Sequence, residues 1–222
     1  MFLSCVDLDM TRRQTLKVIA SPYRTHAAIE ASFSSLALRE DDDCRILWRI
    51  DDGLTADTAR LYIVSPEIPL VHEVADRFGV PEESVRSKDY APFVGRIQDG
   101  SLWRFRLKAN PARKVLVDKA ARPREGAIGS VLGHVTVSQQ IKWLADRSGA
   151  HGFGLIGDPA DVIVSHRARE AFGRDGSKVT LATGQFDGVL RVLDADHFRH
   201  ALGFGIGRAK GFGCGLMTIV PV

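Results

Sequence analysis

The sequence predicts an α+β fold of two tandem domains, each with the ferredoxin-like (RRM-like) order strand, helix, strand, strand, helix, strand. β-rich runs and stretches with helical apolar spacing follow one another in this order over residues 1–90 and again over residues 91–222. Hydrophobic residues make up 45% of the 222 residues, enough to bury one core or two small ones. We therefore expect a domain boundary between residues 90 and 91.

The elements of the first domain follow from local signals. Ser21 and Pro22 begin a helix, because serine is a favoured N-cap and proline fits the first turn, and this helix should run to about Phe33. A second helix over residues 71–78 ends at Gly79, which can adopt the left-handed backbone conformation of a C-cap. Strands are expected where β-branched and aromatic residues gather, over residues 1–8, 45–50, 60–65 and 84–88.

The second domain is predicted to open with a strand that has one basic face, residues 102–109. Apolar residues alternate there with basic ones, and successive side chains of a strand point to opposite faces. The apolar side chains should therefore face the core and the basic ones the solvent. The apolar set is Trp103, Phe105, Leu107 and Ala109, and the basic set is Arg104, Arg106 and Lys108.

The rest of the second domain is less regular. Residues 138–147 form a predicted helix, with Ile141, Leu144 and Ala145 at helical spacing. Residues 151–177 are glycine-rich, and we expect loops there with one hairpin at most. The remaining elements are a strand over residues 186–193, a helix capped by Asp194 or Asp196 and running to about Leu202, and a final strand over residues 216–220.

Composition argues against several classes of protein. No apolar run approaches the roughly 18 residues of a membrane-spanning helix, and Asp7 and Asp9 lie where a signal peptide would be basic and then apolar. The protein is therefore expected in the cytoplasm. Cys5, Cys44 and Cys214 are far apart, so we expect buried free thiols rather than a disulfide framework or a zinc knuckle.

Charge is distributed unevenly along the chain, although 30 Lys and Arg against 27 Asp and Glu give a net charge of only +3. Residues 101–124 contain eight basic residues against Asp118, a local balance of +7. Residues 37–57 contain seven acidic residues against three arginines, a local balance of −4. A segment this basic forms either a solvated face or a surface for a polyanion, and both interpretations stay open at this point.

Residues 203–215 hold six of the 21 glycines. Glycine lets the backbone approach a ligand closely, so successive N–H groups could cradle an anion, with Arg208 and Lys210 as counter-charges. The spacing is not that of a Walker nucleotide-binding loop, and the run follows a predicted helix rather than a first strand. A flexible turn between helix and strand is the alternative interpretation.

Histidine suits proton transfer near neutral pH, and His26 is the most suggestive of the seven histidines. Tyr23 precedes it by three positions on the same predicted helix, so both side chains share one face. Such a pair could act on an RNA 2′-hydroxyl and its phosphate, although ordinary packing explains most pairs of this kind. His197 and His200 lack a clear third ligand, so no metal site is predicted.

Several separated motifs make the chain resemble the CasE family of CRISPR repeat-RNA endoribonucleases. They are Tyr23-Arg-Thr-His26, Arg45-Ile-Leu-Trp-Arg49, the run from Phe105 to Pro111, the run from Gln140 to Leu144, and the C-terminal run from Phe186 through Leu216. The resemblance covers nearly the full length and is weak over residues 119–135 and 151–177. Its glycine-rich C-terminal signature is the most specific part.

The resemblance implies a metal-independent endoribonuclease without cofactors, which binds the hairpin of a CRISPR repeat transcript and cuts at its 3′ base. In this family the 2′-hydroxyl attacks the neighbouring phosphate, leaving a 2′,3′-cyclic phosphate and a 5′-hydroxyl, and the enzyme retains the mature guide RNA. The family's catalytic pair falls on His26, as general acid or base, and on Tyr23, as orienting or proton-donating partner. The other Cascade subunits are the implied protein partners.

RNA binding should rest mainly on backbone contacts, because A-form RNA hides its base edges in a deep, narrow major groove. The expected contacts lie on the basic strand and the segment after it, on a groove-entering hairpin, and on the glycine-rich loop: Arg104, Arg106, Lys108, Arg113, Lys114, Arg167, Arg169, Arg174, Lys178, Gly205, Gly207, Arg208, Lys210 and Gly211.

Two other functions remain open from the sequence. A non-catalytic RNA-binding subunit of the same complex would share the fold and the basic strand, but it would have no use for Tyr23 and His26 on one helix face. A small-molecule enzyme with a ferredoxin-like fold would explain the glycine-rich loop but not the basic strand.

Overall fold

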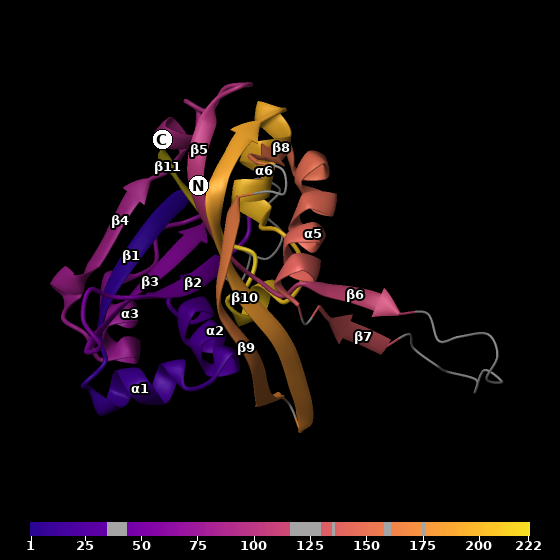
Figure 1. The fold of residues 1–222 in the computed structure, drawn as a ribbon. Helices are drawn as coiled ribbons and strands as arrows, with labels where there is room; N and C mark the ends of the chain where they lie inside the picture. The colour runs from indigo at the N-terminus through magenta and orange to yellow at the C-terminus, as the bar shows by residue number, and fades with distance from the viewer. Residues whose placement is uncertain (35–43, 116–129, 135, 158–160, 175) are drawn as a thin grey trace.

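The computed structural model describes residues 1–34, 44–115, 130–134, 136–157, 161–174 and 176–222. Its main body consists of a four-stranded and a five-stranded antiparallel sheet with helices packed against them, and the small hairpin of β6 (Ala112–Val115) and β7 (Ser130–Gly133) projects to one side (Figure 1). The predicted α+β fold class is confirmed. Within the described residues, no helix is both long enough and apolar enough to span a membrane.

The first sheet has the ferredoxin-like strand order β2-β3-β1-β4, and every neighbouring pair is antiparallel. The elements up to its end are β1 (Phe2–Asp9), α1 (Arg13–Ile19), α2 (Pro22–Glu30), β2 (Leu47–Asp52), β3 (Thr58–Ser65), α3 (Val71–Phe78) and β4 (Val85–Asp89), followed by the short α4 (Ala91–Val94). β2 and β3 lie within two residues of the predicted strands, α3 lies where the sequence predicted it, and Gly79 ends α3 with a φ of 68°.

Two helices of the first domain differ from the prediction. α1 was not predicted, because its N-cap residue Arg12 makes no side-chain capping bond and no local signal marks its start. α2 ends at Glu30 rather than near Phe33. The chain turns there because Ser32 donates its hydroxyl to the carbonyl of Ala28, while its own carbonyl accepts the amide of Leu70 at the start of α3.

The second sheet has the order β11-β5-β10-β8, and β9 also pairs with β10. β8 pairs with residues 190–192 of β10, and β9 pairs with residues 177–188 of β10. The two strands therefore follow one another along the same edge of the sheet. Counted as one strand, they complete the second ferredoxin-like order. The elements are β5 (Leu102–Ala109), β6 (Ala112–Val115), β7 (Ser130–Gly133), α5 (Val137–Ser148), β8 (Phe153–Leu155), β9 (Val162–Arg174), β10 (Ser177–Val192), α6 (Ala195–Phe204) and β11 (Met217–Pro221).

Residues 151–177 hold more regular structure than predicted. β9 and β10 form a long hairpin that extends below the helices in Figure 1, and β10 begins at Ser177 rather than at residue 186. Among the described side chains of β9 only Val162 is buried, so this strand shows no alternating hydrophobic pattern. α5 also differs in its buried face, which contains Trp143 and Leu144 but not Ala145.

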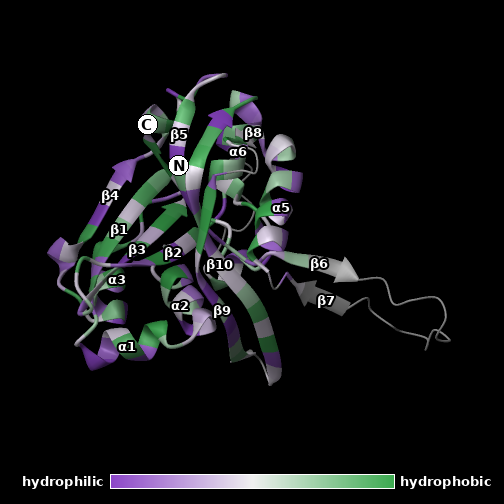
Figure 2. Ribbon diagram, viewed as in Figure 1, coloured by the Kyte–Doolittle hydropathy of each residue, from purple (hydrophilic) through white to green (hydrophobic). Residues whose placement is uncertain are grey.

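The hydrophobic core is not divided cleanly between the two sheets, because one large buried cluster includes side chains of both. Leu47 and Val64 of the first sheet belong to the same buried cluster as Trp143 and Phe186 of the second. A second cluster fills the space between the first sheet and its helices. Hydrophobic residues accordingly run along the strands of both sheets (Figure 2). The boundary between residues 90 and 91 stays a proposal, and it separates two sheets that are packed on each other.

Candidate active site

Helix α2 carries the predicted catalytic pair at the junction of the two domains. Thr25 and Ile29 are fully buried and fix one face of the helix against the first domain. Thr25 further donates its hydroxyl to the carbonyl of Ser21, which ties the first turn together. Tyr23 and His26 are half-buried on the part of the helix that faces away from this core.

His26 lies directly against the glycine-rich loop. Its side chain is 23% exposed, its Nδ1 is buried, and its Nε2 lies 3.4 Å from Oε1 of Glu30, one helical turn further along. A Cβ atom added to Gly211 would lie 3.0 Å from the same Nε2. The 3₁₀ turn Lys210–Phe212 therefore packs on α2, and the two motifs singled out in the sequence meet in space.

The glycines of the loop allow its backbone to pack on buried side chains of both domains. Added Cβ atoms would meet Leu47 at Gly205, Trp143 at Gly207 and Trp48 at Gly213, each at 2.7–2.9 Å. The φ angles of all three glycines are positive, between 75° and 84°. The structure does not support the alternative that residues 203–215 are a flexible turn, because the loop is closely packed on these side chains.

Two backbone hydrogen bonds hold the same loop to its surroundings. Gly215 donates to the carbonyl of Lys108 on β5 at 2.7 Å, and Ile206 donates to the carbonyl of Gly215 at 2.9 Å. Arg208 is exposed to solvent, and its backbone forms an isolated antiparallel β-bridge with that of Asn110. The loop thus has a fixed conformation with respect to both β5 and α2.

The half-buried Lys210 lies near other basic side chains. Burial, and then the charge of Arg45, lower the pKa of Lys210. Burial, followed by the charges of Lys210, Arg147 and His200, lowers the pKa of His151. The side of the glycine-rich loop that carries Lys210 is therefore electropositive, which favours an anionic ligand.

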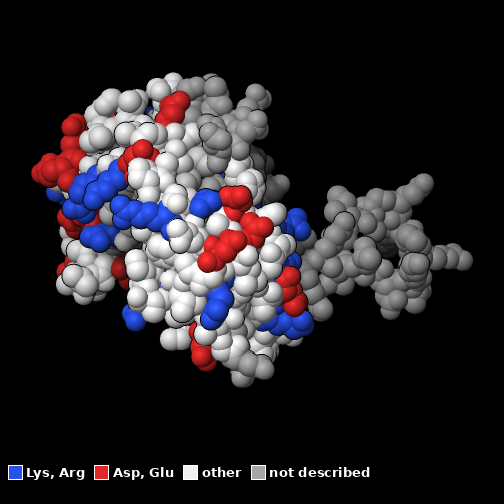
Figure 3. Space-filling view, turned by 90° about the horizontal axis from the view of Figure 1, so that it is seen from above, with Lys and Arg blue, Asp and Glu red and all other residues white. Residues whose placement is uncertain are grey.

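The basic strand β5 has the predicted alternation, but two of its three basic residues are engaged in ion pairs. Arg106 pairs with Asp187 at 2.6 Å, and Lys108 pairs with Glu170 at 3.1 Å. Arg104 is exposed. Viewed from above, Lys and Arg side chains are interspersed with Asp and Glu rather than gathered in one basic area (Figure 3). Of the eight basic residues in the charge run, only Arg104, Arg106 and Lys108 have described side chains, so a single basic face formed by the whole run stays a prediction.

The β9–β10 hairpin carries further predicted residues, and its Phe172 packs against the loop. Phe172 packs edge-on against Phe212 of the 3₁₀ turn, with ring centroids 4.9 Å apart, and β9 also contacts α2. Arg167, Arg169 and Lys178 are exposed on this hairpin. The side chains of Arg113, Lys114 and Arg174 lie outside the described residues, so their roles stay predictions.

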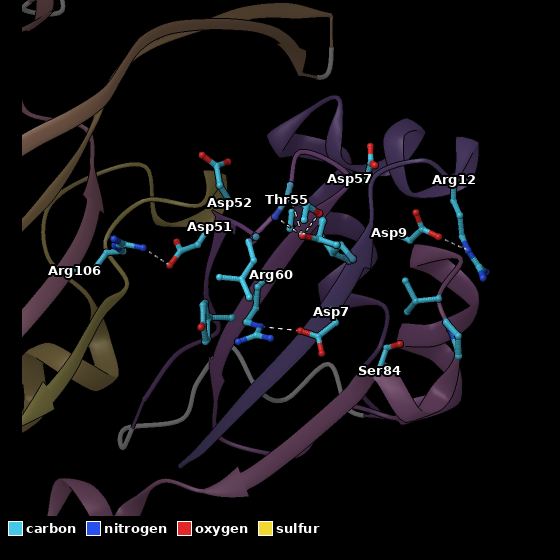
Figure 4. A pocket seen from close by; sticks show the side chains of 18 residues that line it. Asp7, Asp9, Arg12, Asp51, Asp52, Thr55, Asp57, Arg60, Ser84 and Arg106 are labelled. Carbon is cyan, nitrogen blue, oxygen red and sulfur yellow. Dashed lines mark hydrogen bonds and ion pairs between the residues drawn. The ribbon is translucent and has the colours of Figure 1, made fainter.

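A hollow beside the first sheet lies apart from this site. It has a volume of about 870 Å³ and is lined by charged residues of the first sheet together with Arg106 (Figure 4). Asp7 pairs there with Arg60 at 2.7 Å, and Asp9 pairs with Arg12 at 3.1 Å. Because none of the predicted catalytic residues lines it, we do not assign the chemistry to this hollow.

Sequence reasoning missed three residues of the site. Glu30 contacts the His26 ring, and its signal was the spacing of four residues on the same helix. Trp48 packs against Gly213 and Trp143 packs against Gly207 of the glycine-rich loop, and no local signal in the sequence links either tryptophan to the loop. In the part of the chain that the structure describes, no group of three or more His, Cys, Asp or Glu side chains could hold a metal ion.

Comparisons with known proteins agree with this architecture. A family model described as CRISPR associated protein matches residues 1–221. The chain is 26% identical over 235 residues to the CRISPR-associated endoribonuclease Cse3 of Thermus thermophilus, and the match covers 100% of both chains. It is 30% identical to the CRISPR system Cascade subunit CasE of Escherichia coli, over 57% of this chain and 62% of that protein.

Among solved structures, the fold is similar to that of CRISPR endoribonuclease Cse3 bound to a 19-nucleotide RNA, with a TM-score of 0.79 at 24% identity and full coverage of both chains. Cas6e of Escherichia coli is similar as well, with a TM-score of 0.69 at 22% identity, again over 100% of both chains. Since the family model spans nearly the whole sequence, as the resemblance to the CasE endoribonucleases indicated, this chain belongs to the CRISPR associated protein family.

Proposed function

We propose that this protein is the endoribonuclease that cleaves CRISPR precursor RNA at the 3′ base of the repeat hairpin and retains the mature guide RNA. The observation that carries the proposal is the contact between His26 on α2 and Gly211 in the glycine-rich loop, at the junction of two ferredoxin-like domains. The relatives named as CRISPR endoribonucleases support the reaction class. We place the protein in the cytoplasm, with its RNA and the other Cascade subunits.

The proposed reaction is a transesterification within the RNA. The 2′-oxygen next to the scissile phosphate loses its proton and bonds to phosphorus, and the bond from phosphorus to the 5′-oxygen breaks. The 5′-oxygen takes up a proton, so the products are a 2′,3′-cyclic phosphate and a 5′-hydroxyl. His26 is the proposed general acid or base, acting through Nε2, and Tyr23 is the proposed orienting or proton-donating partner.

Negative charge that develops on the phosphate needs cations or amide donors, and in this proposal no metal supplies them. The backbone of the glycine-rich loop is held rigidly beside His26, and Lys210 lies in an electropositive environment next to it. We propose that this loop, with Arg208 and Lys210, contacts the phosphates at the cleavage site. Arg104, Arg167, Arg169 and Lys178 are exposed and would contact the hairpin backbone.

The test is cleavage of a 5′-labelled repeat hairpin from the source organism in EDTA, by the wild type and by His26→Ala. We expect one cut at the 3′ side of the stem by the wild type, and equal binding without cutting by the variant. If both proteins bind and neither cuts, the protein is the alternative, a non-catalytic RNA-binding subunit of the same complex. Cutting that needs added metal would contradict the proposed mechanism.

A further inference from the structure

The orientation of the His26 ring decides which of its nitrogens can reach RNA. Nδ1 is buried, whereas Nε2 points to the space between α2 and Gly211. A substrate oxygen would therefore have to approach Nε2. In the free protein Oε1 of Glu30 lies 3.4 Å from this nitrogen, on a side chain that is 32% exposed.

Helix formation alone does not explain an acid at this position. Glu30 is the last residue of α2, where a negative charge interacts unfavourably with the helix dipole. Its neighbour Ile29 is fully buried and fixes the rotation of the helix, so Glu30 is held on the face that carries His26. The carboxylate is therefore kept beside the imidazole by the packing of the helix.

Other charged groups on the elements packed against α2 do not replace this carboxylate. Glu73 of α3 pairs with Arg77, and Glu170 of β9 pairs with Lys108. Asp76 of α3 is exposed. The remaining charged side chains described on these elements are basic or histidine: Arg13 and Lys17 on α1, His72 on α3, His166, Arg167 and Arg169 on β9, and Lys210 in the 3₁₀ turn.

We propose that Glu30 is a positioning residue for the cleavage reaction, which orients the His26 ring and favours its protonated form in the free protein. When RNA binds, an RNA oxygen replaces Glu30 as the partner of Nε2. The inference rests on the proposed function, because it assumes that His26 acts on RNA. Glu30 would act through His26 and would not contact the reacting atoms itself.

The first experiment is an NMR titration of the His26 ring in the free protein, for the wild type and for Glu30→Gln. Loss of the neighbouring negative charge should lower the midpoint of the His26 titration by about 0.3–1 pH unit. The matched control is Glu73→Gln, which removes the carboxylate that pairs with Arg77 at 2.8 Å with the same spacing on α3. The control should leave His26 unchanged.

The second experiment is the pH dependence of single-turnover cleavage in EDTA by the same variants, at protein and RNA concentrations below the dissociation constant, where the rate reports the ionisation of the free protein. The profile of Glu30→Gln should move to lower pH by the amount seen in the titration, whereas that of Glu73→Gln should coincide with the wild type. An unchanged His26 midpoint in Glu30→Gln, or a changed midpoint without a changed profile, overturns the inference. If the wild type cuts no RNA, the proposed function fails and the role assigned to Glu30 fails with it, whereas the titration still shows whether the two side chains are coupled.

Discussion

Arg49 joins the two domains, and its replacement by methionine should cost a large share of the stability. The side chain is 1% exposed, and it pairs with both oxygens of Asp51, at 2.6 and 3.0 Å. It also donates to the carbonyls of Arg106 and Leu216 and to the hydroxyl of Thr218, at 2.8, 3.1 and 2.8 Å. Arg49 comes from β2, whereas these last three partners lie on or next to strands of the second sheet.

The magnitude follows from what Arg49→Met leaves behind. Methionine fills much of the space, but among the described residues the buried carboxylate of Asp51 keeps only Arg106, at 3.4 Å, as a cationic partner. Removal of one member of a buried ion pair costs about 3–5 kcal/mol, because the other charge stays desolvated. Total stabilities of about 5–15 kcal/mol are typical of folded domains, so the variant should unfold at much lower urea concentration.

Urea unfolding followed by tryptophan fluorescence measures the effect. Arg12→Met is the matched control, because it removes an exposed pair with Asp9 at 3.1 Å and should cost less than about 1 kcal/mol. The double variant Arg49→Met, Asp51→Leu should recover part of the loss, since no charge is then left buried without its partner. If Arg49→Met and Arg12→Met lose the same small amount, the role assigned to Arg49 is refuted.

Three further predictions concern the glycine-rich loop. Gly213→Ala should cost roughly 1–3 kcal/mol more than Gly100→Ala in the same urea assay, because both glycines have positive φ but only Gly213 lies against Trp48; equal losses would contradict the packing described. Burial lowers the pKa of Lys210, so its charge is less favourable in the folded than in the unfolded chain, and stability should rise with pH as that charge is lost. Lys210→Met should therefore raise the melting temperature at neutral pH. It should also weaken RNA binding and reduce by about one the slope of the logarithm of the binding constant against the logarithm of the salt concentration. A lower melting temperature or an unchanged slope would argue against this assignment. Burial raises the pKa of Cys214 to about 12, so a thiol reagent at neutral pH should label it only after unfolding, as read by mass spectrometry; rapid labelling in the native protein would show that the site is open.

Local signals were sufficient for much of the fold. The Ser21-Pro22 start of α2, the Gly79 end of α3 and the alternation in β5 each depend on a few neighbouring residues, and the structure has all three. The β9–β10 hairpin was missed because most of β9 is exposed on both faces, so burial leaves no periodic pattern. Its available signal was the Asp-Gly dipeptide at residues 175–176, a common hairpin turn sequence.

The site could be predicted only in part, because its contacts are non-local. The spacing of Tyr23 and His26 identified one helix face, but the packing of Gly211 on His26 joins segments that are far apart in the sequence. The basic strand shows the same limit. Arg106 and Lys108 are expected to be unpaired cations from the sequence alone. Their partners are Asp187 on β10, which pairs with β5, and Glu170 on β9, which pairs with β10, so only the folded sheet brings these groups together.

The most direct test of the central claim uses a repeat hairpin with a single 2′-deoxy nucleotide on the 5′ side of the scissile phosphate. The wild-type protein, in EDTA, should bind this RNA as tightly as the unmodified hairpin and leave it uncut, while the unmodified RNA yields a 2′,3′-cyclic phosphate and a 5′-hydroxyl. Cleavage of the 2′-deoxy hairpin at the same position would contradict attack by the 2′-hydroxyl and, with it, the roles proposed for His26 and Tyr23.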